Sequence, residues 1–182
     1  MKRTTSRQIL LLAISCLLYG CQRPAEQAAP SNQELLVVYG SQQVIDTVHA
    51  ASEVHAYRLA EASFYEDKLS SYERAGEPVR VAEIDHVTLR DLLLDEESYK
   101  LGLAKECEPV FGVGVSFVAG EKAVDILFCF ECDILAVYQD GKVVGDGDFD
   151  PASTHPQGNL HRRLVTLVKN FFPTDDVIQQ LK

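Results

Sequence analysis

The chain has 182 residues, a mass of 20.2 kDa and a formal net charge of −10, with 46% hydrophobic and 24% charged residues. This length suits a single domain, and the ordinary balance of apolar and charged residues excludes a chain that is disordered throughout. The acidity argues against nucleic-acid binding, which needs a basic face to neutralise phosphates, and against a surface that adheres to anionic lipid head groups.

The N-terminus has the layout of a secretory signal peptide. Three basic residues, Lys2, Arg3 and Arg7, precede an apolar run over residues 9–18 that is too short to span a bilayer as a helix. We therefore expect residues 1–20 to be removed and to take no part in the fold.

The cleavage region Leu18-Tyr19-Gly20-Cys21 resembles the lipobox of bacterial lipoproteins. The resemblance implies a diacylglyceryl thioether and an N-acyl group such as palmitate on Cys21, and several acyl chains hold a protein firmly at a bilayer. Gln22, in place of the Asp that tends to retain such proteins at the inner membrane, implies the outer membrane, facing the periplasm. A plain signal peptide followed by an incidental Cys is the alternative.

Residues 21–33 form the lipidated Cys and a flexible tether, because the segment QRPAEQAAPSNQ is rich in Pro, Ala and Gln and has no apolar period. Residues 34–182 are then expected to form one domain. Its predicted elements in chain order are a short helix capped by Ser41, strands over 53–59 and 79–87 with a polar loop at 62–77 between them, a helix from Thr88 to Leu94, strands over 111–118, 123–138 and 142–144, an acidic loop at 146–150, a helix over 160–172, and a last short helix capped by Thr174.

Two short turns specify how the later strands pair. A two-residue turn at Gly120-Glu121 makes Phe117 face Val124 and Val113 face Phe128, and Asp140-Gly141 makes a second turn. Strands joined in this way are antiparallel, and the helices lie apart from them in the chain. The sequence therefore predicts an α+β fold with an antiparallel sheet of four to six strands and helices packed on one face.

Three cysteines remain in the domain after Cys16 has left with the signal peptide and Cys21 has been lipidated. These are Cys107, Cys129 and Cys132. An exported chain meets an oxidising compartment, which favours one disulfide and leaves one thiol over.

Strand parity suggests which cysteines pair. Alternate residues of a strand point to the same face of the sheet. Along the predicted strands Cys132 is therefore on the face of Phe128 and Cys107 on the face of Val113, whereas Cys129 is on the opposite face. We therefore predict a Cys107–Cys132 disulfide and a free Cys129 thiol, unless a bulge near residue 130 reverses the parity.

A thiol-dependent site is the alternative use of these residues. Cys129-Phe130-Glu131-Cys132 is a CxxC motif, and Cys107 could add a third thiolate to a zinc site completed by His86, His155 or Asp133. The second CxxC pair that is typical of structural zinc is missing. Thioredoxin-like redox chemistry would place the CxxC at a helix N-terminus, whereas apolar, strand-like residues flank it here.

From about Val44 onward the chain resembles a family of bacterial proteins with a shared cysteine motif. The matching residues are Ala51, Val54, Tyr57 and Leu59, then Cys107, Pro109 and Gly112 in C-x-P-x-x-G, and the run 125–132 that ends in C-F-x-C. The resemblance implies that the three cysteines form one group in the fold, and it implies no activity. Val110-Phe111 replaces more polar residues of the family pattern.

Other motifs favour ordinary structural roles. Asp146, Asp148 and Asp150 alternate as in a calcium loop, but Pro151 and Gln157 stand where an EF-hand needs Gly and Glu. The basic residues near 155–163 suit the exposed face of a helix. We find no nucleophile elbow, phosphate loop or dinucleotide fingerprint in the sequence.

The sequence leads to a functional hypothesis rather than a known activity. We expect a lipid-anchored, non-enzymatic binding or interaction module of the cell envelope, with no cofactor, that meets the membrane through its anchor and an unidentified protein or small molecule through its domain. The alternative is a metal-binding or redox-sensing protein that uses Cys107, Cys129 and Cys132, with zinc as the metal.

Overall fold

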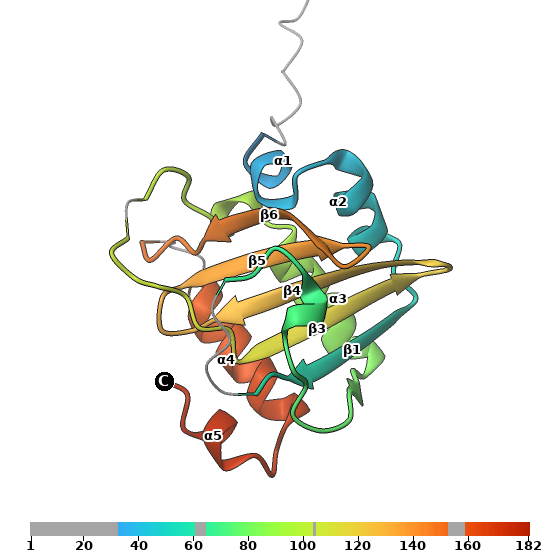
Figure 1. Cartoon of the computed structure of the whole chain (residues 1–182), viewed down its shortest axis with the longest axis vertical. Coiled ribbons are helices and arrows are strands. Elements are labelled where there is room, and N and C mark those ends of the chain that lie inside the picture. The colour runs from blue at the N-terminus through green and yellow to red at the C-terminus, as the bar shows by residue number, and fades with distance from the viewer. Residues whose placement is uncertain (1–32, 61–64, 104, 153–158) are drawn as a thin grey trace, which may run out of the picture. The chain divides into compact units, whose positions relative to one another are not determined.

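The computed structural model describes residues 33–60, 65–103, 105–152 and 159–182 (Figure 1). The predicted signal peptide, the lipidation of Cys21 and the tether up to residue 32 lie outside the described residues, as does His155. Within the described ranges, no helix is both long enough and apolar enough to cross a bilayer.

The domain is built on one antiparallel sheet of six strands, in the spatial order β2-β1-β3-β4-β5-β6. The strands are β1 (Glu53–Arg58), β2 (Val79–Arg80), β3 (Val113–Ala119), β4 (Lys122–Cys129), β5 (Ile134–Gln139) and β6 (Lys142–Asp148). The α+β prediction with four to six antiparallel strands is confirmed.

The predicted register of the central hairpin is also confirmed. Phe117 lies opposite Val124 and Val113 opposite Phe128 across β3 and β4. Gly120 takes the positive φ of 63° that begins the turn, and Asp140-Gly141 makes the β5–β6 turn with φ of 52° and 73°. Positive φ at both central residues is the type I′ pattern, which matches the twist of the joined strands.

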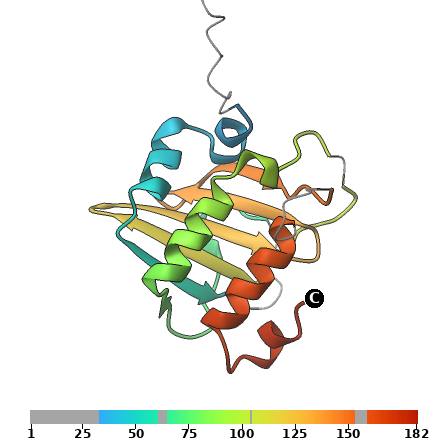
Figure 2. The same cartoon turned by 180° about the vertical axis from the view of Figure 1, so that it is seen from behind.

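Helices cover one face of this sheet (Figure 2). The helices of the described ranges are α1 (Gln33–Tyr39), α2 (Gln42–His49), α3 (Glu83–Leu93), α4 (Leu160–Phe171) and α5 (Asp176–Gln179). Figure 2 shows α3 and α4 across this face, whereas α1 lies at the edge of the sheet, beside β6. All five contribute buried side chains to the core that they form with the inward residues of the sheet, such as Val115 and Ile126.

Helix α1 lies against the edge strand β6 at close range. A Cβ atom at Gly145 would stand 2.2 Å from the carbonyl oxygen of Val38, so only glycine permits this approach. The start of the domain was predicted here, at residue 34, but the helix was not.

The second face of the sheet is covered by loops rather than by helices. The segment that follows β1, with a 3-10 turn at Leu69–Ser71, passes in front of the strands in Figure 1, on the side opposite α3 and α4. Tyr72 and Phe111 pack there against Leu127 and Tyr138, in a smaller apolar cluster. Both faces of the central strands are therefore buried.

The prediction of a strand over 79–87 and a helix from Thr88 was wrong. Strand β2 ends at Arg80, and α3 begins at Glu83, with Glu83 and Asp85 in its first turn. Two apolar residues of the predicted strand, Ile84 and Val87, have exposed side chains. The helix instead buries residues at spacings of three and four, which are His86, Leu89, Leu92 and Leu93.

The prediction of one strand through 123–138 was also wrong. A turn over 130–133 separates β4 from β5, and Asp133 adopts a φ of 54° there. Lys105 holds this turn, because its Nζ donates hydrogen bonds of 2.9 and 2.8 Å to the carbonyl oxygens of Cys132 and Asp133.

Two smaller predictions need correction as well. The expected acidic loop is in fact strand, since β6 continues through Asp146 to Asp148. The last helix is capped by Asp175 rather than Thr174, because the Asp175 carboxylate accepts hydrogen bonds from the backbone N–H of Val177 and Ile178. A carboxylate is the stronger acceptor at a helix N-terminus.

Candidate functional site

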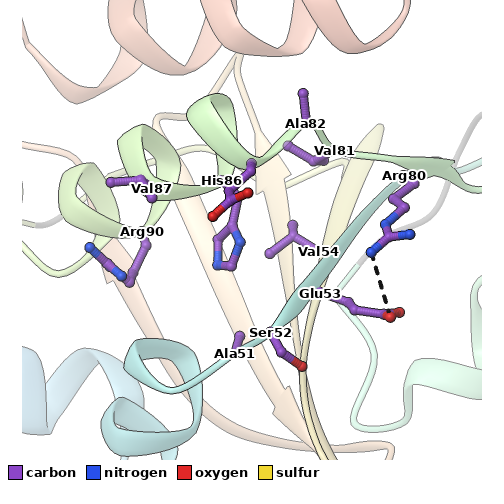
Figure 3. A pocket seen from close by; sticks show the side chains of 11 residues that line it. Ala51, Ser52, Glu53, Val54, Arg80, Val81, Ala82, His86, Val87 and Arg90 are labelled. Atoms are coloured by element: carbon purple, nitrogen blue, oxygen red, sulfur yellow. Dashed lines mark ion pairs between the residues drawn. The ribbon is translucent and has the colours of Figure 1, made fainter.

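A cleft of about 710 Å³ lies between helix α3 and the β1–β2 edge of the sheet (Figure 3). The segment 51–54 lines one wall, and residues 80–83 lie at the entry to α3. The volume is within the range of small-molecule sites in proteins.

Helix α3 forms the second wall of the cleft and presents three polar residues to it. Glu83, His86 and Arg90 stand at i, i+3 and i+7 of α3, and this spacing places them on one face of the helix. Helical rise separates Glu83 from Arg90 by about 10 Å along the axis. The wall is therefore negative at one end, positive at the other, and carries an imidazole between them.

His86 is the buried polar group of the cleft. His86 is only 9% exposed, and its Nε2 atom is buried without a hydrogen-bond partner. The ring packs edge-on against Phe117 of β3, with centroids 6.2 Å apart. In Figure 3 the imidazole points from α3 into the space toward β1.

Burial lowers the pKa of His86 below its ordinary value, and the positive charge of Arg90 lowers it further, against the opposing charge of Glu83. The neutral imidazole is thereby favoured, and it can either donate or accept a hydrogen bond at Nε2 according to its tautomer. Because a buried polar atom without a partner costs free energy, a ligand that reaches Nε2 would recover that cost.

Three of the charged residues that line the cleft, Glu53, Arg80 and Arg90, take part in ion pairs. Arg80 Nη2 lies 3.6 Å from a carboxylate oxygen of Glu53, and both side chains are about half exposed or more. Arg90 Nη2 lies 2.6 Å from Asp91 Oδ1, and the Asp91 side chain is 63% exposed. Ion pairs of this kind are screened by water and contribute little to stability, so a ligand can compete for them.

The three cysteines meet near the turn that follows β4. Cys107 and Cys132 form a disulfide with their Cα atoms 5.8 Å apart, and Cys129 is free and buried. The pair is the one that the sequence analysis predicted, but the parity argument for it was wrong. Cys132 lies in a turn, where strand parity does not apply, and it packs in the second-face cluster together with Cys129.

A zinc site on these cysteines is not assembled in the part of the chain that the structure describes. Among these residues no three His, Cys, Asp or Glu side chains come close enough to hold a metal ion. His86 belongs to the cleft, and Asp133 contacts the ring of His161 at 2.5 Å instead of a thiol. Two of the three proposed sulfur ligands are bonded to each other.

A second polar constellation lies on the loop-covered face. The Tyr57 hydroxyl donates a 2.9 Å hydrogen bond to Asp125, and the guanidinium of Arg74 lies 4.1 Å above the Tyr57 ring. Burial raises the pKa of Asp125, although the hydrogen bond from Tyr57 and the charge of Arg74 oppose the shift. Asp125 is 8% exposed, and its partners satisfy it, so this group serves the packing of the sheet.

Sequence reasoning missed both constellations, for different reasons. The cleft residues were hidden by the strand predicted over 79–87, since the i, i+3, i+7 pattern has meaning only on a helix. Asp125 did carry a usable signal: it is a single acid inside the apolar run 123–130, and a charged residue at such a position needs partners.

No family model, curated protein or solved structure matches this chain. Function is therefore inferred from the residues and the geometry of the domain itself.

Proposed function

We propose that the protein is a lipid-anchored binding module of the cell envelope, without enzymatic activity, and that the cleft between α3 and the β1–β2 edge is its ligand site. The observation that carries the proposal is the buried, unpartnered Nε2 atom of His86 in a cleft of about 710 Å³. Convergent polar groups on a partly apolar lining are typical of sites that fix a small ligand.

The rigidity of the surroundings supports a binding role. Helix α3 is fixed to the core by Leu89, Leu92 and Leu93, which are fully buried. Because these side chains hold α3 in place before a ligand arrives, less conformational entropy is lost on association.

The ligand site is tested by NMR on the full chain with ¹³C-labelled histidine. We expect small polar compounds from a fragment library to shift the ring signals of His86 and to leave those of His49, outside the cleft, unchanged. A Val87→Trp variant fills the cleft from an exposed position of α3 and should abolish the shifts. A library that leaves the His86 signals unmoved would contradict the proposal.

The anchor is a separate part of the proposal, and it depends on the lipobox of residues 18–21. Replacement of Cys21 by Ser removes the acylated atom and should release the protein from the membrane fraction into the soluble periplasmic fraction. Replacement of Gln22 by Asp should move it from the outer to the inner membrane. Retention of the Cys21→Ser variant in membranes would contradict lipidation at this residue.

The cysteine-centred function has weaker support than the cleft. A metal-binding or redox-sensing role needs accessible thiolates, whereas Cys129 is 1% exposed and the other two cysteines are joined. Alkylation of the unfolded, non-reduced chain counts the thiols that are outside a disulfide and distinguishes the two proposals.

A further inference from the structure

The charges that line the cleft are balanced, and this balance restricts the ligand. Arg80 and Arg90 oppose Glu53 and Glu83, while His86 favours its neutral form. A ligand with a charge of one sign would meet as much repulsion as attraction. A ligand that carries one positive and one negative charge, separated along the axis of α3, is attracted to an opposite charge at each end.

The separation of the charges on α3 sets the length of such a ligand. Glu83 and Arg90 are seven residues apart, or about 10 Å along the helix. An extended peptide advances 3.3–3.6 Å per residue, so about three residues span the same distance between a free amino and a free carboxyl group. The buried Nε2 of His86 lies between the two ends, where it can exchange a hydrogen bond with a peptide group of the ligand.

The remaining lining limits the side chains that would fit. Apart from Ser52, the uncharged residues of the lining are small and aliphatic, namely Ala51, Val54, Val81, Ala82 and Val87. Small apolar side chains match these surfaces, since each buried methyl group gains free energy from leaving water.

We propose, building on the ligand site argued above, that the cleft binds short peptides of about three small residues with free termini, the carboxylate at Arg90 and the ammonium group at Glu83. Arg90 has five N–H donors in a planar fork, so it can hold the ligand carboxylate while it still contacts the exposed Asp91. Glu83 lies in the exposed first turn of α3 and is open to an ammonium group.

The experiment is isothermal titration of the purified full chain with trialanine, N-acetyl-trialanine and trialanine amide. We expect saturable binding of trialanine and about tenfold weaker binding of each blocked peptide, because each has lost one charge-assisted contact. Inorganic phosphate is the fourth probe and should not compete with trialanine.

Two variants assign the ends of the peptide. Arg90→Gln should remove the preference for trialanine over its amide, and Glu83→Gln should remove the preference over the acetylated peptide. Arg162→Gln, on the exposed side of α4, changes the net charge by the same amount as Arg90→Gln and should alter neither preference.

The inference is overturned if trialanine does not bind, if the blocked peptides bind as tightly, if phosphate displaces trialanine, or if Arg90→Gln keeps the full preference over the amide. The failure of trialanine together with fragment-induced shifts of His86 would overturn the peptide specificity alone. The absence of any shift at His86 would instead overturn the ligand site itself.

Discussion

The disulfide makes a quantitative prediction about stability. Cys107 and Cys132 are separated by 25 positions in the chain, and the chain-entropy model assigns about 3.5 kcal/mol to the closure of a loop of that length in the unfolded state. For a domain of about 150 residues this corresponds to a shift of roughly 7–14 °C in the unfolding midpoint.

Cys107→Ser is the appropriate perturbation, because the side chain of Cys107 is exposed and the new hydroxyl group stays in water. Cys132 is 5% exposed and keeps its packing in this variant, so the measured loss reports the cross-link rather than a cavity. We expect the free energy of unfolding to fall by about 3–4 kcal/mol.

Urea unfolding with and without reductant provides the assay. Reductant should lower the stability of the wild-type chain to that of Cys107→Ser and should leave the variant unchanged. Alkylation under denaturing, non-reducing conditions should label one thiol, that of Cys129, in the domain. A wild-type chain that is insensitive to reductant, or one with three alkylatable thiols and a bound metal, would refute the reasoning.

Three further predictions concern packing and titration. Gly114→Ala should lower the free energy of unfolding by about 1–3 kcal/mol, because its Cβ would lie 2.5 Å from the ring of Tyr57. Gly112→Ala is the control and should change it little, because no atom lies within 4 Å of its Cβ. Equal losses in urea unfolding would contradict the prediction. The pKa of Asp125 is raised in the folded state, so the stability of the wild type relative to Asp125→Asn should fall as the pH rises above 3.8, through the folded pKa; the two unfolding curves compared across pH test the sign. The pKa of His86 is lowered, so the wild type should lose stability relative to His86→Gln as the pH falls below 6.5, and a constant difference from pH 7.5 to 5 would refute it.

The sequence determined the part of the fold that depends on neighbours in the chain. Alternating apolar residues and two-residue turns fix strand pairing locally, which is why the β3–β4 register could be predicted residue by residue. The apolar stripe of α4, from Leu160 to Phe171, carries its own period and needed no tertiary information.

The tertiary structure decided what the local pattern left ambiguous. Residues 79–87 contain apolar positions that suit a strand as well as a helix, and only the core, which accepts Leu89 and Leu92 while Ile84 stays in water, selects the helix. The cleft followed from that selection. Its two walls are about thirty residues apart in the chain, so Glu53 of β1 and the charged face of α3 come together only when the sheet and α3 pack against each other.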